Sequence, residues 1–181
     1  MGTLRYPEKV KLIIGLLFND ASTYVKAKRD LIRCFGKIDF ESDQLDFTHT
    51  DYYKEEMGEV LKRRFLSFER LFDLKKIYTA KVKTNLIEKK YSKEGSRTIN
   101  IDPGYLNLSK LVLFSTKDYT HRLYLGKGIF AEITLFYKDN TFNPWPWTYP
   151  DYKTSEYLKI FEIIRQIYKD RIAKSSKRCI C

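Results

Sequence analysis

The chain has 181 residues, of which 43% are hydrophobic and 15% aromatic, and 34 Lys and Arg against 23 Asp and Glu give a formal net charge of +11. This length and apolar content predict one domain with a substantial core, and no apolar run is long enough to span a bilayer. With only two histidines and three scattered cysteines, the sequence argues against disulfide frameworks and zinc sites. We therefore expect a cytoplasmic protein without a metal site.

The positive charge favours anionic partners, and the candidate partners are RNA or a nucleotide. A second interpretation is that lysine is enriched throughout the proteome, in which case the charge indicates no partner. Both interpretations stay open at this stage. The sequence predicts no membrane partner and leaves the cofactor and the oligomeric state unknown.

The first third of the chain carries clear patterns. Residues 9–18 form a continuous apolar run that predicts a buried strand. A helix follows, capped by Asp20 or Ser22 and ended by Gly36. Apolar residues alternate with polar ones over residues 37–47, which predicts a half-buried strand with a kink near Ser42.

The middle of the chain is predicted as strands with one short helix. Residues 61–68 favour a strand, and the alternation in residues 75–84 favours another. A short helix should start at Asn85 and close by Gly95. Residues 97–101 predict a short strand that ends in a turn at Asp102-Pro103-Gly104.

The rest of the chain is predicted as follows. The spacing of apolar residues in 106–118 favours a helix over a buried strand. A hairpin should turn at Gly126-Lys127-Gly128, and Asp139-Asn140 should form a further turn. A proline-rich loop, residues 143–152, then leads to a final helix from about Thr154 to Ile172.

Together these elements predict an α+β fold in a single domain, with a mostly antiparallel sheet and two to four helices packed mainly on one face. Residues 1–8 form a lead, residues 9–173 the domain, and residues 174–181 a disordered basic tail.

Several nucleotide-related motifs fail. Gly126-Lys127 lacks the earlier glycine of a phosphate loop, and residues 115–118 lack the spacing of a guanine-reading motif. His49 and His121 lack the paired pattern of two-histidine phosphodiesterases. GTPase and phosphodiesterase mechanisms are therefore rejected.

Polar residues gather near the ends of elements in the second half of the chain. Asp102, His121 and Glu132 are the candidate acid-base residues. We expect Glu132 to lie on a solvated strand face; the alternative is a buried Glu132 paired with His121 or Arg122. The candidate ligand-binding residues are Arg63, Tyr105, Lys117, Asp118, Arg122, Thr148, Tyr149, Asp151 and Tyr152.

Two further stretches combine aromatic residues with features of a binding surface. Lys62, Arg63 and Arg64 follow Tyr52 and Tyr53, a combination found in nucleic-acid binders. In the proline-rich loop, alternation predicts that Trp145 and Trp147 point inward, so that the remaining part of the loop, Thr148 to Tyr152, is available to a ligand.

The segments VKLIIGLLFND, TDYYKEEMG, LKRRFLSFE, NIDPGYL, KLVLFSTKDYTHRLYLGKGIFAEITL and WTYPDY resemble an uncharacterised prokaryotic family catalogued as domain of unknown function 4416. The resemblance runs from about Val10 to about Tyr168 and implies a single-domain bacterial or archaeal protein. Members are sometimes labelled GTP-binding, although this sequence lacks the corresponding motifs. The resemblance implies no particular activity.

Three functions remain open. The first is a binding module for an anionic ligand, either RNA or a nucleotide. The second is an enzyme that acts on a phosphorylated or nucleotide substrate through Asp102, His121 and Glu132, so whether the protein is an enzyme is left open. The third is a structural or assembly subunit.

Overall fold

The computed structural model describes residues 2–48 and 53–178. Predictions that concern His49, Asp51, Tyr52 and residues 179–181 lie outside the described residues. The strands are β1 (Val10–Phe18), β2 (Ile38–Glu41), β3 (Leu45–Phe47), β4 (Leu61–Phe72), β5 (Ile99–Leu106), β6 (Lys110–Ser115), β7 (Leu123–Gly126), β8 (Ile129–Lys138) and β9 (Thr141–Pro144). The helices are α1 (Ala21–Phe35), α2 (Lys54–Met57), α3 (Thr79–Tyr91), the 3-10 turn η1 (Asp151–Lys153) and α4 (Ser155–Arg178).

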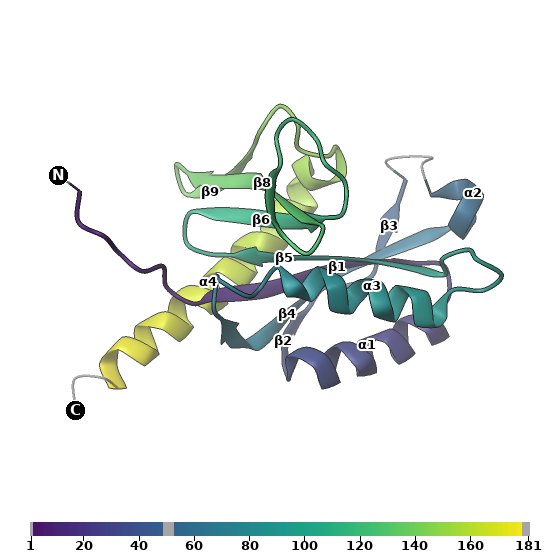
Figure 1. The fold of residues 1–181 in the computed structure, drawn as a ribbon, viewed down its shortest axis with the longest axis horizontal. Helices are drawn as coiled ribbons and strands as arrows, with labels where there is room; N and C mark the ends of the chain where they lie inside the picture. Colours follow the sequence, from purple (N-terminus) through teal and green to yellow (C-terminus); the bar gives the residue numbers. More distant parts are fainter. Residues whose placement is uncertain (1, 49–52, 179–181) are drawn as a thin grey trace.

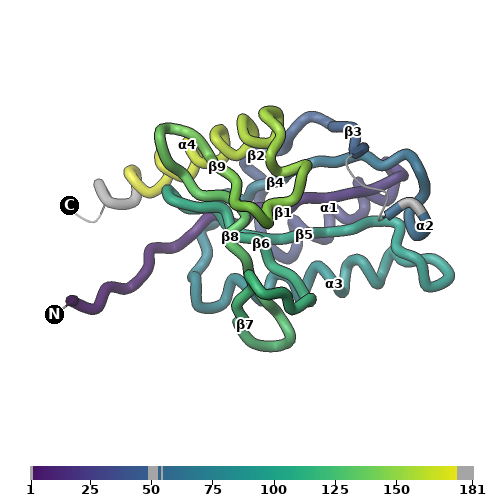
Figure 2. Tube along the Cα trace, turned by 90° about the horizontal axis from the view of Figure 1, so that it is seen from above, coloured from purple at the N-terminus to yellow at the C-terminus, as the bar shows by residue number. Residues whose placement is uncertain are grey.

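The nine strands of the described residues join one antiparallel sheet in the order β2-β4-β1-β5-β6-β8-β7, with β3 also paired to β4 and β9 to β8. Helices α1 and α3 pack side by side on one face of this sheet (Figure 1 and Figure 2). Helix α4 covers part of the opposite face. The predicted class, a single-domain α+β fold with a mostly antiparallel sheet, is confirmed.

Strand β1 runs through the middle of the sheet and is buried along its whole length. Leu12, Ile14 and Leu16 join the core under α1 and α3, whereas Ile13 joins the core under α4. A strand covered on both faces reads as an unbroken apolar run, which is why the sequence revealed it directly.

Helix α1 begins and ends where the sequence predicts. The Asp20 side chain accepts hydrogen bonds from the backbone N–H groups of Ser22 and Thr23, at 3.1 and 2.9 Å. Gly36 follows the last residue with a φ of 95°, a conformation that favours glycine. The half-buried strand predicted over residues 37–47 is present as β2 and β3, separated near Ser42.

The strand predicted over residues 75–84 is wrong, because most of this stretch belongs to α3. The helix starts at Thr79 and contains Asn85 in its interior, so the predicted start at Asn85 is also wrong. Its buried side includes Lys81, Thr84 and Glu88. Polar residues on the inner side of a helix hide the apolar period by which helices are recognised in sequences.

The turn predicted at Asp102-Pro103-Gly104 is wrong as well, because β5 runs straight through these residues. Gly104 is needed there because a Cβ atom would lie only 2.2 Å from the Val112 carbonyl oxygen of β6. The helix favoured over residues 106–118 is likewise wrong, since Lys110–Ser115 form the buried strand β6.

The end of the chain follows the prediction closely. The β7–β8 hairpin turns at Gly126 to Gly128, and Asp139 and Asn140 both have positive φ at the next turn. The final helix extends further than expected, to Arg178. None of the helices within residues 2–48 and 53–178 is both long and apolar enough to cross a membrane.

Candidate functional site

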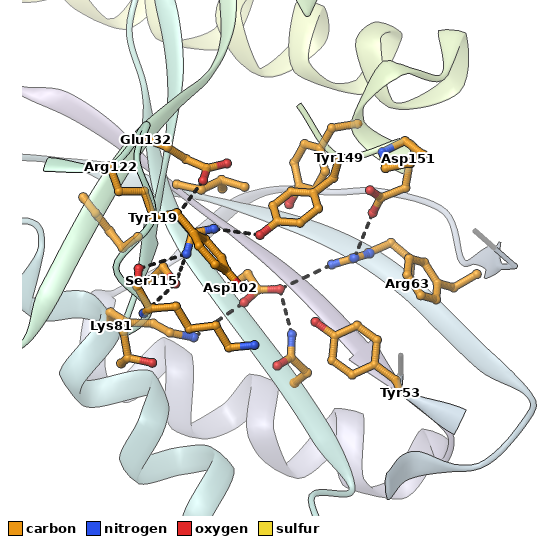
Figure 3. A pocket seen from close by; sticks show the side chains of 18 of the residues that line it. Tyr53, Arg63, Lys81, Asp102, Ser115, Tyr119, Arg122, Glu132, Tyr149 and Asp151 are labelled. Atoms are coloured by element: carbon orange, nitrogen blue, oxygen red, sulfur yellow. Dashed lines mark hydrogen bonds and ion pairs between the residues drawn. The ribbon is translucent and has the colours of Figure 1, made fainter. Parts of the chain in front are cut away.

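A cleft of about 390 Å³ opens on the face of the sheet that carries α4. Its floor is made by β4, β5, β6 and β8. Its walls come from Tyr53 and Arg97, from η1 with the preceding Tyr149, and from the loop between β6 and β7 (Figure 3). The cleft brings together segments that lie as far apart in the chain as residues 47 and 152.

Gly15 of β1 makes room in the floor of this cleft. It pairs with Phe65 of β4 on one side and Asp102 of β5 on the other. A Cβ atom at this position would lie 3.1 Å from Arg63 Nη1 and 3.3 Å from the Tyr152 hydroxyl. The missing side chain therefore lets a guanidinium group and a phenol lie directly over the central strand.

Arg63 extends from β4 into the cleft although its side chain is only 3% exposed. Its Nη2 donates to Asp151 Oδ2 at 3.1 Å, and its Nη1 lies 3.9 Å from Asp102 Oδ2. Within the described part of the chain, neither Nε nor Nη1 makes a hydrogen bond. Burial alone would lower the pKa of Arg63, but the surrounding tyrosines and carboxylates raise it above its usual value. Arg63 is thus a permanent buried cation with unused donors.

Asp102 lies at the centre of the floor, and 28% of its side chain is exposed. Asn100 Nδ2 donates to Asp102 Oδ2 at 2.7 Å, and Lys81 Nζ lies 3.5 Å from Oδ1. Asp102 is therefore surrounded by donors and cations, and it remains accessible from the cleft.

Lys81 reaches the cleft through a gap in the sheet. Strands β5 and β6 pair only between Gly104–Leu106 and Leu111–Leu113, and Pro103 has no N–H with which to extend the pairing. At Ile101, α3 replaces the missing strand: Lys81 Nζ donates to the Ile101 carbonyl at 2.9 Å, and the Ile101 N–H donates to Glu88 Oε1 at 2.5 Å. Burial raises the pKa of Glu88, and nearby Lys81 opposes this shift.

One wall of the cleft is formed by Arg97 and Tyr53. Arg97 donates through Nε and Nη2 to both carboxylate oxygens of Glu56, at 2.8 and 2.6 Å, and through Nη1 to Asn100 at 2.8 Å. Its guanidinium carbon lies 5.7 Å from the centre of the Tyr53 ring. Burial raises the pKa of Tyr53 above its usual range, so its hydroxyl stays protonated at neutral pH.

The opposite wall is organised by Arg122. Its Nε donates to Glu132 Oε2 at 2.7 Å, Nη1 to Ser115 Oγ at 2.9 Å and to the Lys117 carbonyl at 3.0 Å, and Nη2 to the Tyr149 hydroxyl at 2.7 Å. Burial would lower the pKa of Arg122, but Glu132 and Tyr149 raise it above its usual value. Arg122 thus ties three segments of the wall together.

Glu132 is almost fully buried, so the solvated strand face predicted for it is wrong. Its Oε2 accepts from Arg122 and lies 3.0 Å from His121 Nε2. Both partners that the sequence offered as the alternative are therefore in contact with Glu132. Since its charge is held by Arg122, this carboxylate positions the wall of the cleft.

A row of stacked rings continues from His121 away from the cleft. The His121 ring stacks on Trp147 at 5.5 Å between centroids, and Trp147 stacks on Trp145 at 5.2 Å. Trp145 is half-buried, but Trp147 is 38% exposed, so the prediction that both tryptophans point inward is wrong for Trp147.

The structure brings many of the predicted site residues together. The cleft is lined by Arg63, Asp102, Lys117, Arg122, Glu132, Tyr149, Asp151 and Tyr152. His121 lies behind Glu132 and does not line the cleft.

Three predicted ligand-binding residues lie elsewhere. Tyr105 packs against Phe114 in the core under α1 and α3. Thr148 is buried and donates to the Thr134 carbonyl at 2.5 Å, and Asp118 is exposed outside the cleft. Alternation along β5 explains the position of Tyr105, which faces the side of the sheet opposite to Asp102.

Sequence reasoning did not assign a site role to Lys81, Arg97, Asn100 or Tyr119, which also line the cleft. Asn100 is two residues before Asp102 on one strand, a spacing that places both side chains on the same face. That signal was present in the sequence. Lys81 carried no such signal, because α3 had been assigned to a strand.

The predicted basic cluster, residues 62–64, does not lie on one face, because neighbouring residues of β4 point to opposite faces of the sheet. Arg63 faces the cleft, whereas Arg64 donates to Glu41 and Lys62 pairs with Asp46. Among residues 2–48 and 53–178, no group of three or more His, Cys, Asp or Glu side chains is placed to hold a metal ion.

Residues 8–168 match the model of a family described as Domain of unknown function (DUF4416). No curated protein and no solved structure matches the chain. The match covers every strand of the sheet and all residues that line the cleft. The chain therefore belongs to the DUF4416 family, as the resemblance noted in the sequence implied.

Proposed function

We propose that the protein binds a small phosphorylated ligand of the nucleotide type in the cleft. The observation that carries this proposal is Arg63, a buried guanidinium group that reaches the cleft with Nε and Nη1 unused within the described residues. A buried donor without an acceptor costs about 1–3 kcal/mol. An oxyanion in the cleft that accepts a charge-assisted hydrogen bond from Nη1 would remove part of this cost.

The side chains that line the cleft include more cations than carboxylates, which favours an anionic ligand at the lining itself. The lining contains five cationic side chains and three carboxylates. Two of these carboxylates, Glu132 and Asp151, already accept from arginines in the cleft. Two further acids, Glu56 and Glu88, hold Arg97 and Lys81 from behind. An added anion would therefore be shared mainly by Arg63 and by the basic side chains at the rim.

The aromatic side chains of the cleft support a ligand that also has a planar part. Tyr53, Tyr119 and Tyr149 line it, and rings of this kind stack on nucleobases. Burial raises the pKa of Tyr149, although neighbouring Arg122 opposes this shift, so its hydroxyl remains protonated at neutral pH. A volume of about 390 Å³ is in the usual range for small-molecule sites and suits a mononucleotide better than a stretch of RNA.

The test is a thermal-shift and calorimetric screen with inorganic phosphate and with nucleoside mono-, di- and triphosphates. A ligand at 100 times its Kd would stabilise the folded protein by about 2.7 kcal/mol. Arg63→Gln should weaken binding at least about tenfold, since hydrogen bonds to charged groups contribute about 1.5–3 kcal/mol. Arg64→Gln, one residue along the same strand but facing away from the cleft, is the matched control and should bind normally.

Because Arg63→Gln changes a buried residue, Lys117→Gln at the exposed rim is a second test that does not depend on the core. It should weaken phosphate-containing ligands more than the corresponding nucleosides. If no phosphate compound shifts the melting temperature of the wild-type protein, or if Arg63→Gln binds like the wild type, the proposal is wrong.

A second candidate function is an enzyme that acts on such a ligand. Asp102 supports it, because this carboxylate is accessible in the cleft between Lys81 and Arg63, where it can accept a proton from a substrate hydroxyl group or water. Glu132 and His121 would then hold Arg122 in position. Turnover of a bound nucleotide by the wild type, abolished in Asp102→Asn with binding retained, would support this function; binding without turnover would leave the protein a binding module.

A further inference from the structure

The net positive charge of the chain is concentrated on the helical layer formed by α1, α3 and the residues next to them. Residues 21–37 and 73–94 contain twelve Lys and Arg but only four Asp and Glu, a net charge of +8 out of the +11 of the whole chain. A lysine enrichment spread through the proteome would distribute the charge over all surfaces. The uneven distribution indicates instead that this layer has a partner.

The two acidic side chains within α1 and α3 themselves are buried. Asp30 is buried between the two helices, where it accepts from Lys90 at 2.5 Å and from Tyr91 at 2.7 Å. Glu88 is buried against Ile101 and Lys81. The two remaining acids, Asp73 and Glu94, lie outside the helices. The exposed cations of α1 and α3 therefore outnumber the carboxylates that pair with them, since Arg33 and Lys90 share Asp30 and Lys28 pairs with Glu41 of β2.

The cations form a row along α1. Lys26, Arg29, Arg33 and Lys37 are exposed, and their spacing of three and four residues places them along one side of the helix and just beyond its end. Exposed lysines of α3 lie beside this row, because the two helices pack together and Lys83 Nζ sits 5.5 Å from the Phe35 ring of α1. The result is a basic surface two helices wide.

The residue types on this surface favour one class of anionic partner over the others. The rings of α1, Tyr24 and Phe35, are buried, and the exposed large apolar residues on the described parts of the two helices are Val25, Ile32 and Leu86. An amphipathic helix that inserts into a membrane surface uses a continuous apolar face rich in Trp, Phe or Leu, and single-stranded nucleic acid is held partly by rings on which bases stack. The α1–α3 surface offers neither feature. The phosphate backbone of a duplex requires only spaced cations.

We infer that the α1–α3 surface binds the phosphate backbone of a double-stranded nucleic acid without reading its sequence. The surface lies on the face of the sheet opposite the cleft, so this inference does not depend on the ligand proposed there. Duplex DNA and duplex RNA share the relevant chemistry, and the experiment separates them.

The experiment measures binding of the full chain to a labelled short duplex of DNA, the same duplex of RNA, a single strand of each, and vesicles that contain phosphatidylserine. At least one duplex should bind more tightly than its single strand and than the vesicles. Its affinity should fall steeply between about 50 and 200 mM salt, because each phosphate contact releases counterions.

Two triple variants locate the binding surface. Lys26→Gln, Arg29→Gln and Lys89→Gln remove three exposed charges from α1 and α3, and Lys159→Gln, Lys169→Gln and Lys174→Gln remove three from α4 on the other face. The first should weaken duplex binding by at least about tenfold and make the salt dependence shallower by about one unit per lost contact. The α4 variant should bind within about twofold of the wild type.

The inference is wrong if neither duplex binds at low salt, if the vesicles or the single strands bind more tightly, or if both triple variants weaken binding equally. Arg63→Gln, the variant that tests the cleft, should leave duplex binding unchanged. Failure of one proposal is therefore separable from failure of the other.

Discussion

Replacing Arg122 by Met should reveal how much the wall of the cleft depends on one buried ion pair. The side chains of Arg122 and Glu132 are each only 2% exposed, and Arg122 makes three further hydrogen bonds, to Ser115, the Lys117 carbonyl and Tyr149. Met fills a similar space but donates nothing, so the variant leaves a carboxylate buried without its arginine.

The size of the effect follows from this burial. Removing one partner of a buried ion pair costs about 3–5 kcal/mol. His121 Nε2 remains 3.0 Å from Glu132 Oε2 and can take over part of the pairing, so we expect a loss near the lower end, about 3 kcal/mol. Against a typical stability of about 5–15 kcal/mol, this loss is large enough to measure accurately.

The assay is urea denaturation, followed by circular dichroism, of the wild type, Arg122→Met, Glu132→Gln and the double variant. The double variant should lose less stability than the sum of the single losses by at least about 1 kcal/mol, because it contains no unpaired charge. Strict additivity, or a loss below about 1 kcal/mol, would refute the assignment of Arg122 as the organiser of this wall.

Two further predictions concern stability. Gly104→Ala should destabilise the protein by about 2 kcal/mol or more, because its Cβ atom would meet the Val112 carbonyl oxygen at 2.2 Å; Gly2→Ala, with no atom within 4 Å, should be neutral in the same denaturation assay. The hydrogen bonds from Arg97 lower the pKa of Glu56 below its usual 4.5, so their contribution is present above pH 4.5 and is lost as the pH falls through the lowered value. Glu56→Gln should therefore flatten the acid side of the stability profile, and an unchanged acid side would contradict this pairing.

The sequence predicted those parts of the fold in which the residue types alone indicate a buried strand or a helix end. Strand β1 is apolar because both of its faces are covered, and α1 is bounded by Asp20 and Gly36, whose conformations are local. Local signals of this kind do not depend on which other segment packs nearby.

The wrong predictions about α3 and β5 have one physical cause. Contacts between distant segments place a residue in surroundings that its residue type alone does not indicate. Lys81 and Glu88 look like surface positions but face inward, since they complete the hydrogen bonds of Ile101. Pro103 looks like a turn residue, yet it lies in a strand where the neighbouring strand has already separated. The contacts of Lys81 and Glu88 depend on where α3 docks, and the surroundings of Pro103 depend on where the β5–β6 pairing ends. Neither of these can be read from the sequence.

Some residues of the cleft could be predicted from the sequence and others could not. Asp102, Arg122 and Glu132 were chosen because polar residues gather near the ends of elements in the second half of the sequence, and the structure brings all three to the lining of one cleft. The placement of Arg63 beside Asp151 depends on a contact across 88 residues, and no local pattern reports it.

The separation between β5 and β6 divides the sheet along a seam. On each side the strands are joined by long ladders, whereas across the seam the ladder is three residue pairs long, and α3 closes the remainder with one ammonium and one carboxylate group. The Ile101 amide therefore lies in the middle of a nine-stranded sheet but is protected by a helix. The rate at which this amide proton exchanges with deuterium will depend on how often α3 undocks from the sheet. The exchange rate of one amide therefore measures motion of the two halves of the sheet relative to each other.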